Sequence, residues 1–200
     1  KSTARRIWKF NRRIRKLKKD KGHKIIYAEG DSWFQFPIFI RDIIDWLNRN
    51  KNYIIYSDAY GGDWITNIIY ESQYVSALSV LRPDVFLISG GGNDLVSDNR
   101  LAIMVKKYSE PQVYRPKYTI QKPINNTILT REQKEMIMKA QEHITREFYA
   151  FLLVIKAQYL LLFNSLYFGN NNTDSKFKDM ISITQGYDYA IPGLKPKWKI

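Results

Sequence analysis

Four short apolar runs, separated by segments of helical periodicity, constrain the fold of this chain more than any other feature. The runs have the length and composition of buried strands, and they lie at residues 24–29, 53–56, 84–89 and 180–183. Strands that alternate with helices form a parallel sheet, with right-handed crossovers and helices on both faces. The sequence therefore predicts an α/β fold with three layers: helices, sheet and helices.

Three helical segments connect the predicted strands. Pro37 can open the first, and the second is expected from about Ile65 to Leu81, because Pro83 cannot lie inside a helix. Thr130 and Gln133 have the spacing of a capping box, so we expect them to open the third helix. Its apolar positions recur as far as Leu162, which predicts one long helix.

Two further segments need an interpretation of their own. Residues 97–129 contain three prolines, several tyrosines and little periodicity, which predicts an irregular insertion of the kind that often carries function. The run Phe148–Phe163 is strongly apolar, but it is shorter than the roughly 20 residues of a membrane span. Lys156 and Gln158 also interrupt it, so we expect a helix buried against the sheet.

The composition excludes several classes of site. The 200 residues contain no cysteine, so disulfides, thiolate nucleophiles and cysteine metal sites are excluded. With only His23 and His143, a histidine-rich metal centre is not expected either. The chain begins with lysine, which suggests a processed or partial product, and it shows neither a signal peptide nor a membrane span. We therefore expect a cytoplasmic protein without a metal.

The positive charge is concentrated in an N-terminal arm, residues 1–23. Residues 1–24 hold twelve basic residues and one acidic residue, a net +11 of the chain's +13. Apolar residues recur in the arm at helical spacing: Ile7, Phe10, Ile14 and Leu17. We expect an amphipathic helix whose apolar stripe docks on the domain while its cations stay solvated. A membrane or nucleic-acid role is the alternative; we expect weak contact with anionic surfaces and no specific nucleic acid.

A short polar motif follows each of the first three predicted strands. These motifs are Gly30-Asp31-Ser32, Gly61-Gly62-Asp63 and Gly91-Gly92-Asn93-Asp94. Ligands of open α/β sheets bind at the carboxyl ends of the strands, so the three motifs should lie at one edge. A hydroxyl nucleophile and an amide donor at that edge indicate acyl transfer. Asp31 and Asp94 are expected to shape their loops rather than to react.

In residue identity, order and spacing, the three motifs resemble those of the SGNH hydrolase family, also called GDSL esterases. The resemblance implies a flavodoxin-like fold and hydrolysis of a small-molecule or carbohydrate ester through an acyl-Ser32 intermediate, with no cofactor. Ser32 would be the nucleophile and its backbone N–H an oxyanion donor. The Gly62 N–H, with Gly61 as the alternative, and the Asn93 amide would be the other donors.

Aromatic residues near these motifs are candidates for the wall of the substrate site. Trp33 and Phe34 follow the nucleophile directly, and Tyr108 and Tyr114 lie in the insertion that leaves the third strand beside Asn93. Such a loop is placed to cover a cleft. Simple packing is the alternative for Trp33 and Phe34.

The resemblance fails at the catalytic base. The family's base is a histidine in an Asp-x-x-His motif after a fifth strand, and neither His23 nor His143 fits that place. We therefore expect residues 24–200 to lack the last strand–helix unit, with esterase activity in a longer protein. One alternative is a non-catalytic binding module that keeps the pocket without the base. A nucleotide-binding domain using Gly90–Gly92 is disfavoured, because neither common phosphate-loop motif is present.

Overall fold

The protein is described by a computed structural model that divides into two units. The first unit is Lys1–Gly92 with Lys176–Ile200, and the second is Asn93–Ser175. The residues that the structure describes are 3–17, 22–36, 41–105, 130–132, 135, 139, 143–168 and 177–185. Pro37, Gln133, Tyr108 and Tyr114, with most of the predicted insertion, lie outside the described residues.

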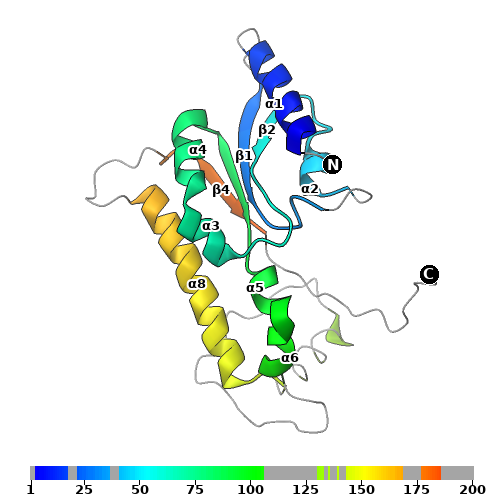
Figure 1. Cartoon of the computed structure of the whole chain (residues 1–200), viewed down its shortest axis with the longest axis vertical. Coiled ribbons are helices and arrows are strands. Elements are labelled where there is room, and N and C mark those ends of the chain that lie inside the picture. Colours follow the sequence, from blue (N-terminus) through cyan, green and yellow to red (C-terminus); the bar gives the residue numbers. More distant parts are fainter. Residues whose placement is uncertain are drawn as a thin grey trace, which may run out of the picture. The chain divides into compact units, whose positions relative to one another are not determined.

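The first unit is built on a four-stranded parallel sheet, as predicted. Its strands are β1 (Lys24–Gly30), β2 (Tyr53–Ser57), β3 (Val85–Ser89) and β4 (Ile181–Thr184). They are hydrogen-bonded in the order β2-β1-β3-β4, and every pair is parallel (Figure 1). Each strand lies within one or two residues of its predicted position, because buried parallel strands are near-continuous apolar runs.

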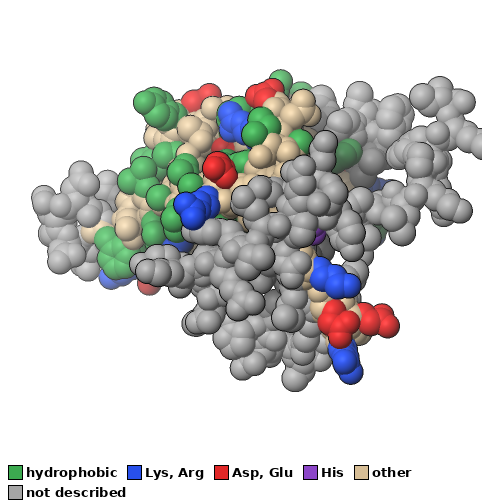
Figure 2. All heavy atoms as spheres, turned by 90° about the horizontal axis from the view of Figure 1, so that it is seen from below, with side chains coloured by type: hydrophobic (Ala, Val, Ile, Leu, Met, Phe, Trp, Pro, Cys, Tyr) green, Lys and Arg blue, Asp and Glu red, His purple; other side chains and the backbone are tan. Residues whose placement is uncertain are grey.

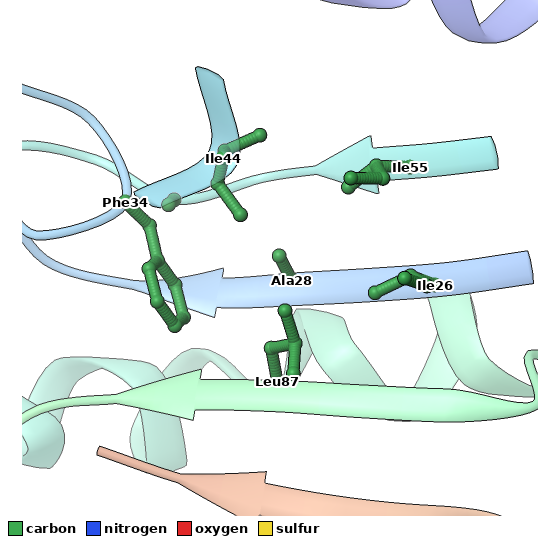
Figure 3. Packing of buried hydrophobic residues seen from close by; sticks show 7 residues of the cluster. Ile26, Ala28, Phe34, Ile44, Ile55 and Leu87 are labelled. Carbon is green, nitrogen blue, oxygen red and sulfur yellow. The ribbon is translucent and has the colours of Figure 1, made fainter. Parts of the chain in front are cut away.

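Helices cover both faces of this sheet. Those of the first unit are α1 (Thr3–Leu17), α2 (Ile43–Leu47), α3 (Ile65–Glu71) and α4 (Gln73–Leu81). On one face, Ala28 and Leu87 pack in a cluster with Phe34 and with Ile44 of α2 (Figure 3). On the other face, Phe86 stacks on Tyr74 of α4, with ring centroids 6.2 Å apart. The predicted three-layer α/β architecture is therefore confirmed.

The second unit contains short helices and one long helix. The short ones are α5 (Gly92–Val96), which begins at the last residue of the first unit, the 3₁₀ helix η1 (Ser97–Asn99) and α6 (Arg100–Met104). The long helix is α8 (Arg146–Tyr167). Thr145 joins α6 to α8, since its backbone N–H and its hydroxyl both donate to the carbonyl oxygen of Met104.

Two predicted helices are interrupted, and in both places a small hydroxyl residue marks the break. The helix expected over 65–81 divides at Ser72, which has a left-handed φ of +53° and separates α3 from α4. The helix expected to run from Thr130 to Leu162 does not continue through residues 143–145. Thr145 begins α8 instead, because its hydroxyl accepts the N–H of Phe148 as an N-cap.

The prediction that the apolar run 148–163 is buried is wrong for most of α8. Only Leu162 and Leu166 of this helix are buried, whereas Leu153 and Leu161 are exposed. Hydrophobic side chains are also visible at the surface on the face drawn in Figure 2. By length and composition, α8 is the one described helix that could cross a membrane. Core helices of soluble proteins meet the same criterion, so this property does not show that α8 lies in a membrane.

The N-terminal arm forms the expected helix and docks on the first unit beside β2. Phe10 packs edge-on against Tyr56, with ring centroids 5.1 Å apart. The expectation that the cations stay solvated is wrong for two arginines. Arg6 is only 7 % exposed and bonds Asp42 and the carbonyl of Phe34, while Arg13 donates to several carbonyls, among them that of Asn48 at 2.8 Å. Carbonyls at the ends of neighbouring elements need donors, and arginine supplies them.

Candidate active site

The glycine of the first motif is required by the close approach of two strands. Gly30 ends β1 and is paired with Ser89 at the end of β3. A Cβ atom at Gly30 would lie 2.5 Å from the Ser89 carbonyl oxygen and 2.9 Å from the Ser89 Cβ. No other residue fits there without movement of the sheet. The motif therefore begins at a close approach of β1 to β3.

Asp31 builds the turn that carries Ser32. Its side chain is fully buried, and Oδ1 accepts the Ser89 hydroxyl at 2.9 Å and the Trp33 N–H at 3.2 Å. Its carbonyl accepts the N–H groups of Phe34 and Gln35 at 3.0 and 3.1 Å. These bonds confirm the predicted loop-shaping role of Asp31. Ser32, at the top of this turn, is half-buried.

The loop after β2 is tied to the same turn. The Tyr60 N–H donates to the Gly30 carbonyl at 2.8 Å, and the Gly61 N–H donates to Gln35 Oε1 at 2.9 Å. Since the Gly61 N–H is already used, Gly62 is the better candidate for an oxyanion donor. Gly62 is exposed with φ +94°, and no described atom lies within 4 Å of the place a Cβ would take.

The third motif follows β3. Gly91 has φ +100°, and Asn93 lies half-buried on α5 as the first residue of the second unit. Chain connectivity keeps Asn93 four residues from Ser89, the partner of Gly30. The convergence of Ser32, Gly62 and Asn93 stays a prediction, as does the loop-shaping role of Asp94.

The aromatic candidates differ in their surroundings. Trp33 is 48 % exposed, so its ring is accessible beside Ser32, and its contact with substrate stays a prediction. Phe34 is 3 % exposed and belongs to the core cluster with Ala28 and Ile44 (Figure 3). Packing, the alternative that the sequence allowed, therefore accounts for Phe34.

The two histidines lie away from the Ser32 turn along the chain. His23 directly precedes β1, at the amino end of the strand whose carboxyl end carries Ser32. His143 belongs to the second unit, in a turn before α8 rather than on the helix where we expected it. Among the described residues, no group of three or more histidine, aspartate or glutamate side chains could hold a metal ion.

A cavity of about 410 Å³ at the carboxyl ends of β1 and β2 was not anticipated from the sequence. Its lining includes four carboxylates: Glu29, Asp58, Asp63 and Glu71. Glu29 is 6 % exposed, and it accepts the Tyr27 hydroxyl at 2.6 Å and the Gly30 N–H at 3.1 Å. The Tyr27 hydroxyl also lies 3.3 Å from Asp58 Oδ2, so Glu29 and Asp58 share one donor.

Burial raises the pKa of Glu29 to about 7; the hydrogen bond from Tyr27 opposes that rise, and the nearby charge of Asp58 adds to it. Burial also raises the pKa of Asp58. Glu29 therefore gains or loses its proton near neutral pH, and it lies three residues before Ser32 in the sequence. One signal was available in the sequence, since Glu29 is a charged residue directly after the apolar run Ile25–Ala28.

The similarity of this chain to known proteins is weak. No protein-family model matches the sequence, and no curated protein gives a significant match. One similar crystal structure is that of a protein from Parabacteroides merdae ATCC 43184 described as a GDSL-like lipase. The match has 18 % identity and a TM-score of 0.26, and it covers 37 % of this chain and 42 % of that one. This chain therefore spans less than half of that protein, and a likeness of this size assigns neither family nor activity.

Proposed function

We propose that this chain carries the nucleophile and the oxyanion donors of a serine ester hydrolase. The substrate would be a carboxylic ester or acetyl ester. The observation that carries the proposal is the Gly30-Asp31-Ser32 turn. A buried carboxylate and a glycine whose Cβ would clash with Ser89 hold Ser32 half-exposed at the carboxyl end of the central strand β1. Nucleophiles of α/β enzymes occupy such positions.

In the proposed reaction, Ser32 Oγ attacks the ester carbonyl carbon and gives up its proton to a base. The Ser32 and Gly62 N–H groups and the Asn93 amide would stabilise the negative oxygen of the tetrahedral intermediate. The intermediate then expels the alcohol and leaves the acyl group on Ser32. Water attacks this second ester, which releases the acid and restores the hydroxyl.

We assign no base. A serine hydroxyl reacts slowly unless a group accepts its proton, and His23 lies at the opposite end of β1 from Ser32. This observation favours a second candidate, a non-catalytic module that binds an ester or carboxylate without cleaving it. Both candidates use the same turn, and they differ in whether Ser32 becomes acylated.

Labelling with a fluorophosphonate probe distinguishes the two candidates. The reaction is run with added imidazole, which can take the proton that no assigned side chain accepts. We expect the adduct on the peptide containing Ser32, loss of labelling in Ser32→Ala, and full labelling in the control Ser79→Ala, an exposed serine on α4. Labelling that survives Ser32→Ala would rule out the assignment. Ester binding without any labelling would favour the binding module.

The oxyanion donors have their own test in the same assay. Removal of one donor lowers the rate of such reactions by about 10²–10³. We therefore expect Asn93→Ala to slow labelling of Ser32 by that factor while the unfolding free energy changes little. An unchanged labelling rate would remove Asn93 from the site.

A further inference from the structure

Docking of α1 uses only part of this strongly basic helix. Phe10, Arg6 and Arg13 face the first unit, where they contact Tyr56, Asp42 and the carbonyl of Asn48. On the outer side, Arg12 is exposed and Trp8 is 58 % exposed. The helix contains seven basic residues and no acidic residue. Its outer side therefore presents an exposed cation beside an exposed indole ring.

This outer side borders a basic groove of about 430 Å³. The groove is lined by six residues from α1, the segment before β1 and the turn before β2: Trp8, Lys9, Arg12, Arg13, His23 and Lys51. None of these described lining residues is acidic. Arg12 lies over the Trp8 ring, 5.4 Å from its centroid, which holds a cation beside an accessible aromatic surface.

We propose that this groove binds single-stranded nucleic acid without sequence preference. Proteins that bind single strands in this way combine a basic groove, which follows the phosphates, with aromatic side chains on which bases stack. Here Lys9, Arg12 and Lys51 supply the cations and Trp8 supplies the stacking surface. The groove shares no lining residue with the Ser32 turn, so it does not depend on the proposed esterase chemistry.

An anionic membrane is the competing partner, and the docked state of α1 disfavours it. An amphipathic helix binds a bilayer by burying its apolar face among the lipids. In this protein Phe10 of that face is already buried against Tyr56. Insertion would require α1 to leave the first unit and would expose the partners of Arg6. A groove also suits an extended strand of phosphates better than a flat surface of headgroups.

Fluorescence anisotropy of the full chain with a labelled oligothymidylate of about 12 nucleotides tests the proposal. Three phosphate contacts predict a slope of about −2 for log affinity against log salt. Affinity should therefore fall about 20-fold between about 50 and about 200 mM salt. The variant Lys9→Gln/Arg12→Gln/Lys51→Gln should bind at least about tenfold more weakly at the lower salt and lose most of this slope.

A matched control removes the same charge elsewhere. Lys139→Gln/Lys156→Gln/Lys178→Gln replaces three exposed lysines outside the groove and should keep the affinity within about twofold. Equal weakening of both triple variants would mean that only net charge is recognised and would overturn the proposal.

Trp8→Ala supplies a second variant that leaves the charge unchanged. Loss of one stacked base predicts about tenfold weaker binding, with the salt slope retained. Tyr70→Ala, at an exposed aromatic of α3, is the control and should have no effect. Unchanged binding of Trp8→Ala would overturn the proposal. So would tighter binding to phosphatidylserine vesicles than to the oligonucleotide.

Discussion

The first unit buries carboxylates in two regions that differ in the sign of the charge beside them. Beside α1, the Asp42 side chain is almost fully buried, bonds the Arg6 guanidinium and caps α2 by accepting the Asp45 N–H at 2.9 Å. At the carboxyl end of β1, Glu29 is equally inaccessible, but the charges that act on it are those of two acids, Asp58 and Asp63. The charge of Asp42 is thus neutralised by a cation, whereas the surroundings of Glu29 raise the proton affinity of its carboxylate.

This difference sets a structural ion pair apart from a candidate functional group. The pair of Arg6 and Asp42 fixes α1 beside β2, and the cost of burying each ion is offset by the other. For Glu29, the hydrogen bonds from Tyr27 and the Gly30 N–H only partly offset its burial, so its ionised form is destabilised. Groups with perturbed pKa values cluster at functional sites, and Glu29 lies three residues before Ser32.

Removal of the Arg6–Asp42 ion pair should have the largest effect on stability. Arg6→Met leaves the Asp42 carboxylate buried without its cation, which typically costs about 3–5 kcal/mol. We expect a loss of that size in the unfolding free energy, measured by urea denaturation. Arg5→Met, at an exposed neighbour on α1, should change it by less than about 0.5 kcal/mol. Similar effects of the two variants would contradict the structural role of Arg6.

Titration of Glu29 should make the unfolding free energy depend on pH. The pKa of Glu29 is about 7 in the folded protein, against an ordinary value of 4.5, so the folded state holds the proton more tightly. The stabilisation is therefore fully present below about pH 4.5 and is lost as pH rises to about 7. A shift of this size corresponds to about 3 kcal/mol.

Glu29→Gln isolates this contribution because glutamine does not titrate. We expect the unfolding free energy of the original chain, minus that of Glu29→Gln, to fall by about 3 kcal/mol between about pH 4 and pH 8. Urea denaturation at several pH values measures it. A difference that stays constant over this range would show that Glu29 keeps an ordinary pKa.

A pair of glycine substitutions should have smaller effects and sharpen the description of the Ser32 turn. Gly30→Ala forces a Cβ against the Ser89 carbonyl and should cost about 2–3 kcal/mol. Gly62→Ala meets no described atom, so only its positive φ opposes it, and it should cost about 1 kcal/mol. Thermal unfolding of both variants checks the order. A larger cost at Gly62 would contradict the packing of β1 against β3.

The strands and the loop-shaping role of Asp31 could be predicted from the sequence because they depend on local patterns. An apolar run such as Val85–Ser89 is a buried strand wherever the sheet places it. Asp31 begins a turn because its short side chain reaches the N–H of Trp33, two residues away.

The remaining features depend on tertiary contacts. Arg6 is buried because Asp42 and the Phe34 carbonyl meet it across α1 and α2, which no helical periodicity encodes. The exposure of Leu153 on α8 and the bond from Tyr27 to Glu29 are likewise set by surroundings rather than by residue type. Thr145 is a residue type that favours the N-cap position, but the apolar periodicity on both sides of it predicted one continuous helix.

The central claim is that Ser32 becomes acylated, and the mass of its peptide tests this most directly. The chain is incubated with an aryl acetate and a hindered pyridine base, which accepts a proton without itself taking the acetyl group, and is then quenched in acid, digested and analysed by mass spectrometry. We predict one acetyl group on the peptide containing Ser32, absent in Ser32→Ala and retained in Ser79→Ala. No acetyl group on that peptide, or the same acetyl group on it in Ser32→Ala, would contradict the proposed function.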